Sequence, residues 1–262
     1  MPKVDILVSN RNSLEAIQLC VESVHAYTRP GDYQLIVYDD VSDNGIDVPY
    51  LRGKQEQGWL RLIEGKSRVF HGGALNALVN VTCESDLAVI MDCDIEILRD
   101  GWLDDFLKLI ADDPLAIAAV RCHGVQVRGG TSRGGAYLAP FCEWWFGLLN
   151  MQAYRDDMQV DWGISWVSTK EEFMALPDAA SLPIDKMATY SFDVGCKFYD
   201  KVLHNNPRGY YIVSPLPGHI NNAFTHYLQV CHHIADGLPE ITAHVQKKLD
   251  VMRQKLKGLR HG

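Results

Sequence analysis

The chain has 262 residues, of which 47% are hydrophobic and 22% are charged, which suits one large α/β domain or two closely joined halves. Its formal net charge of −8 argues against nucleic acid as the main partner, and no segment reaches the roughly 20 apolar residues of a transmembrane helix. The seven cysteines lie at least ten positions apart and form no CxxC pair, so we expect reduced thiols in a cytoplasmic protein.

The first 120 residues alternate apolar runs with helical patterns. Helical spacing and apolar runs predict helices after Asn12 or Ser13, at 72–82 and at about 100–112, and strands at 4–9, 33–38, 59–63, 87–91 and 115–120. Alternation of this kind indicates βαβ units, so we predict a mostly parallel central sheet flanked by helices.

A stretch rich in glycine and arginine follows at 124–135, with Arg128 and Arg133 between the glycines. It lacks the GxxxxGK[ST] pattern of a P-loop. The stretch could form either a flexible lid or a hairpin loop.

The rest of the chain is less regular. An aromatic cluster, a predicted helix and a predicted strand follow one another at 141–146, about 192–204 and 210–214. We therefore divide the chain into a first half, a second half and a C-terminal segment, at 1–120, 121–236 and 237–262.

The C-terminal segment predicts an amphipathic helix. Its apolar residues recur at helical spacing and are Ile241, Val245, Leu249, Met252, Leu256 and Leu259. From Glu240 onward six Lys or Arg surround this apolar seam, against two acidic residues. The helix could lie on an anionic membrane, pair with a second copy as a coiled coil, or pack on its own body.

Three acids follow the apolar run of the fourth predicted strand, in the stretch VIMDCDIEI. On an extended backbone Asp92, Asp94 and Glu96 would point to one face, at the strand end where open parallel sheets bind ligands. Carboxylates without neighbouring Cys or His suit hard cations such as Mg²⁺ or Mn²⁺, and such a cation stabilises a departing diphosphate. The alternative is that these acids are solvated charges at a strand end.

In its first 120 residues the chain resembles the family 2 glycosyltransferases, which have the GT-A fold. The motifs in chain order are VDILVSNRN, IVYDDVSDNG in place of the usual strand and DDGS turn, HGGALNALV, and MDCDIEIL followed by GWLDDFL. The resemblance implies a single α/β domain with a Rossmann-like, mostly parallel sheet and two abutting halves. It also implies a transferase that uses a nucleoside diphosphate sugar, with UDP as the expected nucleotide, and Mn²⁺ or Mg²⁺.

The resemblance assigns the donor side of the site. By the match Asp94 is a metal ligand, and Asp92 holds ribose or sugar hydroxyls of the donor. An acid that ends the second strand would recognise the base, which is Asp39, with Asp40 as the next choice. The remaining donor-binding candidates lie in the loop after the first strand and before the helix HGGALNALV, where the usual Asn-Gly pattern is absent; they are Ser9, Arg11, Arg68 and His71.

The resemblance also implies a third metal ligand, for which neutral imidazole suits Mn²⁺. A histidine that follows a late strand serves this role in many GT-A enzymes, and His219 in YYIVSPLPGH has that order. His226, His232 and His233 lie nearby and could serve instead.

The catalytic base of an inverting transferase is a carboxylate that takes the acceptor hydroxyl's proton. Asp193, near the start of a late predicted helix, fits the family's order, although it could instead cap that helix. Glu143 and Asp156 are rivals. Trp144 and Trp145 could stack on the acceptor sugar.

We therefore predict an inverting glycosyltransferase that acts by direct displacement, in the cytoplasm or peripherally at the inner membrane face. Its acceptor would be a saccharide, a lipid-linked molecule or a small molecule. One alternative is a nucleotidyltransferase that forms nucleotide sugars, although VSNRNSLE is not the glycine-rich, basic loop of that class. Another alternative is a relative that binds nucleotide or sugar without catalysis.

Overall fold

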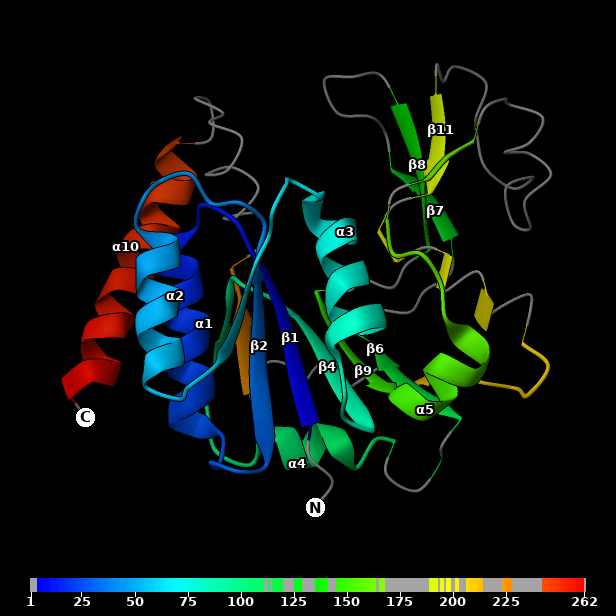
Figure 1. The fold of residues 1–262 in the computed structure, drawn as a ribbon, viewed down its shortest axis with the longest axis horizontal. Helices are drawn as coiled ribbons and strands as arrows, with labels where there is room; N and C mark the ends of the chain where they lie inside the picture. Colours follow the sequence, from blue (N-terminus) through cyan, green and yellow to red (C-terminus); the bar gives the residue numbers. More distant parts are fainter. Residues whose placement is uncertain are drawn as a thin grey trace.

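The computed structural model describes residues 4–110, 113, 115–119, 125–128, 135–140, 145–163, 165–167, 189–192, 194–195, 197–198, 201–202, 206–213, 223–227 and 242–261. A seven-stranded sheet forms the centre, in the order β12-β6-β9-β4-β1-β2-β3 (Figure 1). Its strands are β1 Val4–Asn10, β2 Tyr33–Asp39, β3 Arg61–Glu64, β4 Leu87–Asp92, β6 Ala116–Ala119, β9 Phe146–Asn150 and β12 Tyr211–Val213. Only β9 runs antiparallel to its neighbours in this described sheet, so the predicted mostly parallel sheet is confirmed.

Helices cover both faces of the sheet (Figure 1). The helices on one side are α1 Leu14–Tyr27 and α2 Asp47–Glu56, and those on the other are α3 Phe70–Leu75, the π-helix η1 Asn76–Thr82, α5 Met151–Ala153 and the π-helix η2 Tyr154–Met158. The short helix α4 Trp102–Leu107 replaces the longer one predicted at about 100–112. The helix α2 was not predicted from the sequence.

Each strand of the central sheet contributes side chains to two separate hydrophobic cores, one on each face of the sheet, because successive side chains point to opposite faces. In β1, Ile6 and Val8 pack in the core that contains α1, whereas Leu7 packs in the core that contains α3. In β4, Met91 packs in the core that contains α1, and Ile90 packs in the core that contains α3. Burial on both faces explains why these strands appear in the sequence as continuous apolar runs.

The segment with the three acids is not one extended run, which corrects the sequence-based expectation. β4 ends at Asp92, a turn occupies Cys93 and Asp94, and β5 Ile95–Ile97 begins a separate sheet. There β5 pairs antiparallel with β13 Phe224–His226, which places His226 opposite Ile95. The turn is needed because β5 leaves the central sheet to pair with a strand from the far end of the chain.

A four-stranded sheet lies beyond the central one and contains β7 Val125–Arg128, β8 Gly135–Pro140, β10 Ser165–Val167 and β11 Thr189–Phe192. β7 pairs antiparallel with β8, as the hairpin alternative requires, and residues 129–134 between them lie outside the described part of the chain. The predicted helix at about 192–204 is only partly observed, since β11 extends to Phe192 and helical residues occur at 197–198 and 201–202.

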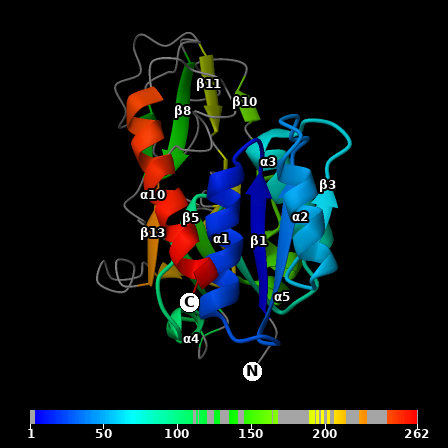
Figure 2. The same cartoon turned by 90° about the vertical axis from the view of Figure 1, so that its left-hand side faces the viewer.

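The C-terminal helix α10 Thr242–His261 lies along α1 (Figure 2). The apolar seam is covered, because Val245, Leu249, Met252 and Leu256 are buried in a cluster with residues of α1 and with Tyr227. Of the three sequence-based alternatives, the structure therefore shows packing on the protein's own body. No helix in the described parts of the chain has the length and hydropathy to cross a bilayer.

The helix α3 approaches the loop after η2 so closely that one position requires glycine. A Cβ on Gly72 would lie 2.6 Å from the Cα of Gly163 and 2.8 Å from the carbonyl oxygen of Trp162. These are backbone atoms, so they cannot move aside as a flexible side chain would. The close approach holds the start of α3 against the second half of the chain.

We expect Gly72→Ala to lower the free energy of unfolding by about 1 to 3 kcal/mol, the usual cost of overpacking. Gly53→Ala is the matched control, because Gly53 lies inside α2 and an added Cβ would meet nothing within 4 Å. That change should raise stability by about 0.5 to 1 kcal/mol through helix propensity. Urea denaturation of both variants measures the difference, and equal effects would contradict the close approach.

Candidate metal and donor site

The carboxyl ends of β1, β2 and β4 meet at one edge of the central sheet. In the register of these parallel strands, Ser9 lies opposite Asp92 and Asn10 lies opposite Asp39. The loops that follow the three strands therefore surround one region, where open parallel sheets bind ligands.

Two carboxylates and one imidazole converge at this edge. Asp92, Asp94 and His226 each offer one ligand atom, and these atoms lie within 4.8 Å of one another. The Nε2 atom of His226 is 3.2 Å from Oδ1 of Asp94 and 3.6 Å from Oδ2 of Asp92. His226 reaches the acids because β13 pairs with β5, immediately after the turn that carries Asp94.

The geometry of the cluster fits a divalent cation. Oδ1 of Asp94 is buried and forms an ion pair with His226, but it accepts no well-directed hydrogen bond from the described residues, so it can still serve a cation as a ligand. Octahedral ligands at about 2.1 Å from an ion are separated by about 3 Å from one another, close to the spacing of Asp94 and His226. Carboxylate oxygens with one imidazole nitrogen suit Mn²⁺, and carboxylates suit Mg²⁺.

The imidazole of His226 is held between the two acids and an aromatic ring. Burial lowers its pKa, but the negative carboxylates of Asp92 and Asp94, which face its Nε2–H, outweigh burial and raise the pKa to about 9. The indole of Trp145 stacks on the imidazole at 4.4 Å between ring centroids. The predicted acceptor contact of Trp145 stays a prediction, and the contact that the structure records is support of His226.

His71 and Ser9, which the resemblance assigns to the donor side, lie beside Asp92, and their role in donor binding stays a prediction. Nδ1 of His71 is 2.8 Å from the hydroxyl oxygen of Ser9, and its Nε2 is 3.8 Å from Oδ1 of Asp92. The strand β1 and the helix α3 thus place a hydroxyl and an imidazole next to one candidate metal ligand.

Arg11 and Asp40 are engaged in holding the loops of this edge together. Nη1 of Arg11 donates to the carbonyl oxygens of Asp40 and Val41 at 2.6 and 2.7 Å. The carboxylate of Asp40 in turn accepts the backbone N–H groups of Val69 and Phe70 at 2.7 and 2.9 Å. Asp40 therefore joins the end of β2 to the start of α3.

Asp39 lies in a buried polar network. Its carboxylate accepts hydrogen bonds from the side-chain nitrogen of Asn10 at 3.0 Å and from the backbone N–H and hydroxyl of Ser42 at 2.8 and 2.6 Å. The Asn10 amide also donates to Asp47, whose carboxylate accepts the backbone N–H of Ser13. The network fixes the ends of β1 and β2, and recognition of a base by Asp39 stays a prediction.

Backbone strain gathers at the same edge. The non-glycine residues with positive φ among those described are Asn12, Val41 and Phe70, at 48°, 58° and 61°. They follow β1, follow β2 and begin α3 respectively, and a left-handed conformation is costly for a branched or bulky side chain. At the third of them the ring of Phe70 is exposed, and its centroid lies 4.3 Å from the guanidinium of Arg68.

Several predicted residues lie outside the described part of the chain. They are Glu143, Trp144, Asp193 and His219. His226 was named from the sequence only as one of three histidines near His219. The signal that distinguishes His226 is its pairing with β5, which joins residues about 130 positions apart and leaves no local pattern.

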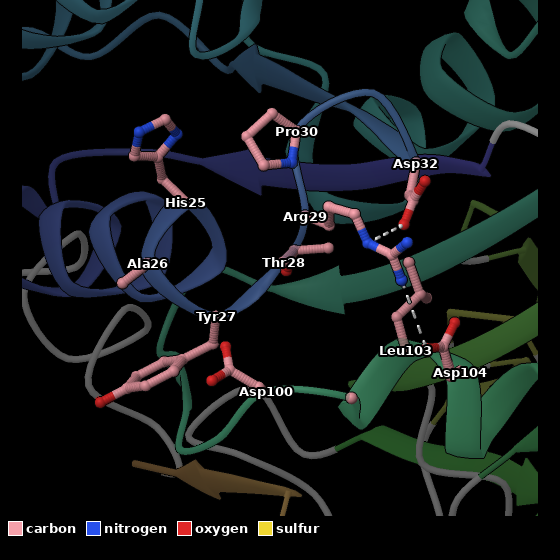
Figure 3. A pocket seen from close by; sticks show the side chains of 11 residues that line it. His25, Ala26, Tyr27, Thr28, Arg29, Pro30, Asp32, Asp100, Leu103 and Asp104 are labelled. Atoms are coloured by element: carbon pink, nitrogen blue, oxygen red, sulfur yellow. Dashed lines mark ion pairs between the residues drawn. The ribbon is translucent and has the colours of Figure 1, made fainter.

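A hollow of about 370 Å³ lies at the opposite edge of the sheet (Figure 3). The end of α1, the loop before β2 and the start of α4 line it, and Arg29 forms ion pairs there with Asp32 and Asp104. The backbone N–H of Val4, at the start of β1, donates to Asp32, which places the hollow at the amino ends of the strands. Its described lining contains none of the predicted site residues.

Comparison with known proteins gives one family and several distant structures. Residues 5–174 match glycosyl transferase family 2. A curated relative, the uncharacterized protein y4gI of Sinorhizobium fredii, is 26% identical over 117 residues, which is 41% of this chain and 12% of that protein. This chain therefore spans only a small part of that relative's length.

Two similar solved structures contain a bound nucleotide sugar. The mannosyltransferase PcManGT from Pyrobaculum calidifontis, in complex with GDP-Man and Mn²⁺, is 17% identical and covers 61% of this chain and 50% of that chain, with a TM-score of 0.45. S. aureus TarS 1–349, in complex with UDP-GlcNAc, is 14% identical and covers 94% of this chain and 70% of that chain, with a TM-score of 0.44.

The raised pKa of His226 predicts how stability of the metal-free protein depends on pH. A histidine whose pKa rises from 6.5 to about 9 on folding adds stability that is complete below pH 6.5. That contribution is lost as pH rises through 9, by at most about 3 kcal/mol for a shift of this size. Urea denaturation in EDTA should therefore show wild type losing stability between pH 7 and 9.5 relative to His226→Gln. A constant difference between the two proteins across this range would contradict the ion pairs of His226.

Proposed function

The chain belongs to glycosyl transferase family 2, and from this premise we propose that it transfers a sugar from a nucleoside diphosphate to an acceptor hydroxyl with the aid of a divalent cation. The observation that carries the proposal is the convergence of Asp92, Asp94 and His226 at the carboxyl edge of the sheet. This edge also gathers Ser9 and His71, which supports the proposal because polar side chains for a diphosphate would then lie beside the cation.

The proposed reaction is a direct displacement with inversion at the anomeric carbon. Asp92, Asp94 and His226 would hold Mn²⁺ or Mg²⁺, which when bound supplies positive charge against the leaving diphosphate. His71 and Ser9 would orient the diphosphate from the side of Asp92. The acceptor oxygen would attack the anomeric carbon as the bond to the diphosphate oxygen breaks, and a carboxylate would take the hydroxyl proton.

UDP is the proposed nucleotide, with the base on the side of β2. The carboxylate of Asp39 already accepts two hydrogen bonds from Ser42. Direct contact between Asp39 and a base would therefore require Ser42 to move; otherwise Ser42 would itself contact the base and connect it to Asp39. Arg11 and Asp40 would act by holding the loop 40–43 and the start of α3 in place.

Residues of the second half of the chain would form the acceptor side of the site. Asp193 is the proposed base, with Glu143 as its rival, and Trp144 and Trp145 are the proposed sugar-stacking residues. A saccharide, a lipid-linked molecule or a small molecule would suit such a site. Peripheral contact with an anionic membrane would use the exposed Lys247 and Lys257 of α10, since the apolar seam is covered.

Binding of nucleoside diphosphates tests the donor site. In isothermal titration we expect UDP to bind wild type with Mn²⁺ and to bind at least about tenfold more weakly in EDTA or to Asp94→Asn, because a cation ligand is lost. Asp100→Asn is the matched control, since Asp100 lines the hollow at the opposite edge of the sheet. GDP, dTDP and CDP in parallel identify the base. Binding that is indifferent to both Mn²⁺ and Asp94→Asn would overturn the metal mechanism.

Slow hydrolysis of UDP-sugars without an acceptor, measured as release of UDP, tests catalysis. Water would replace the acceptor, and removal of the base should slow the release by about 100-fold or more while UDP affinity is retained. Asp193→Asn should show this loss, and Glu143→Gln should not. The reverse pattern would transfer the role of base to Glu143. Tight UDP binding by wild type without any hydrolysis of UDP-sugars would favour a non-catalytic relative.

A further inference from the structure

Glu96 is the third acid of the stretch VIMDCDIEI, and the proposed reaction does not use it. Its side chain is buried and accepts hydrogen bonds from the hydroxyl of Tyr227 at 2.8 Å and from Nζ of Lys255 at 2.6 Å. These partners come from the residue after β13 and from the C-terminal helix α10. Glu96 therefore joins the segment of the candidate metal ligands to an element more than 150 residues away.

The partners of Glu96 also adjoin the cation site directly. Tyr227 follows His226 in the chain, and its backbone N–H donates to the carbonyl oxygen of Asp94 at 3.0 Å. Its own carbonyl oxygen accepts a hydrogen bond from Nζ of Lys248 of α10 at 3.0 Å. Glu96 of β5 and Tyr227, the residue after β13, are thus both hydrogen-bonded to lysines of α10, which lies near both strands (Figure 2).

The small sheet that carries His226 packs into the main core through Ile95, Ile97 and Phe224, and the Glu96 cluster ties it to α10 as well. The strands β5 and β13 have three residues each and, among the described residues, pair with no further strand. A two-stranded sheet is marginally stable in water without packing against other elements. A shift of about 1 Å in a ligand is enough to weaken a metal site, so the position of His226 depends on what holds β13 to β5.

The attachment of α10 to α1 does not by itself explain the Glu96 cluster. The apolar seam is buried against α1, and Arg253 forms an ion pair with Glu15 of α1 at 2.6 Å. That pair is partly exposed, and exposed pairs contribute little to stability. Glu96, in contrast, is a buried carboxylate whose charge requires its partners, so loss of Lys255 would disturb the segment around it.

We propose that Glu96, Tyr227 and Lys255 are positioning residues that hold β13 against β5 and so keep His226 within reach of Asp92 and Asp94. The C-terminal helix is then part of the metal site through Lys255, although it supplies no ligand. The effect on metal affinity rests on the proposed function, whereas the effect on β13 does not.

Two measurements on the full chain test this assignment. The first is hydrogen exchange of the amides of residues 223–227, which reports whether β13 stays paired with β5. The second is isothermal titration of MnCl₂ alone, which reports the metal site without nucleotide. The variants are Lys255→Met, which removes the charge, Tyr227→Phe, which removes one hydroxyl, and Lys255→Arg, which keeps the charge.

We expect Lys255→Met and Tyr227→Phe to speed exchange at residues 223–227 at least about tenfold. Both should weaken Mn²⁺ binding by about 10-fold or more, the usual loss when a group behind a metal ligand is removed. Lys255→Arg should restore binding to within a few-fold of wild type. Arg253→Met is the matched control, because Arg253 lies on the same helix as Lys255 but pairs with Glu15 of α1 and with Asp250, so its loss should change neither readout.

Unchanged exchange at residues 223–227 in both Lys255→Met and Tyr227→Phe would overturn the proposal. Faster exchange with unchanged Mn²⁺ affinity would also overturn it, because His226 would then not depend on the cluster. Should Lys255→Met fail to fold, Tyr227→Phe decides alone. Absence of Mn²⁺ binding by wild type would count against the proposed function, and hydrogen exchange would still decide whether the cluster holds β13.

Discussion

The arrangement of the site depends on two carboxylates that are held beside each other at the end of β4. Like charges at such spacing destabilise each other unless a positive charge lies between them. His226 supplies that charge in the metal-free protein, which is why its pKa rises to about 9 although burial alone would lower it. A divalent cation would supply the charge more strongly and would return His226 to the neutral form that binds metals. The need for positive charge beside the two carboxylates thus explains both the raised pKa of His226 and the fit of the cluster to a cation.

The surrounding polar groups keep this cluster at a defined place. Asp39 at the end of β2 and Asp40 directly after it accept hydrogen bonds from neighbouring loops, so two further acids have hydrogen-bond donors within the protein. Arg11 binds the loop after β2, and strained residues occur in the loops after β1 and β2 and at the start of α3. Strain of this kind persists only where neighbouring contacts impose it, as expected of a preformed binding edge.

The sequence predicted much of the fold because most strands of the central sheet are buried on both faces and appear as apolar runs. It missed α2, whose ten residues bury only Asp47 and Leu51 and so lack an apolar stripe. It also predicted one extended run through the acids, because a turn at Cys93 and Asp94 has no glycine or proline to mark it.

The candidate site was predictable only where its residues are close in the chain. The acids Asp92 and Asp94 were identified from their position after a buried strand and from the family resemblance. The histidine was not resolved among its neighbours, because only the pairing of β13 with β5 brings His226 to Asp94. The hydrogen bonds of Glu96 were not predictable for the same reason, since its partners Tyr227 and Lys255 are distant from it in sequence.

Electron–nuclear double resonance on bound Mn²⁺ tests the central claim most directly, with protein labelled with ¹⁵N at histidine. The account predicts one ¹⁵N coupling of a directly bound imidazole, which disappears in His226→Gln and persists in His71→Gln. Absence of a ¹⁵N coupling in wild type, or its persistence in His226→Gln, would show that Asp92, Asp94 and His226 do not form the metal site.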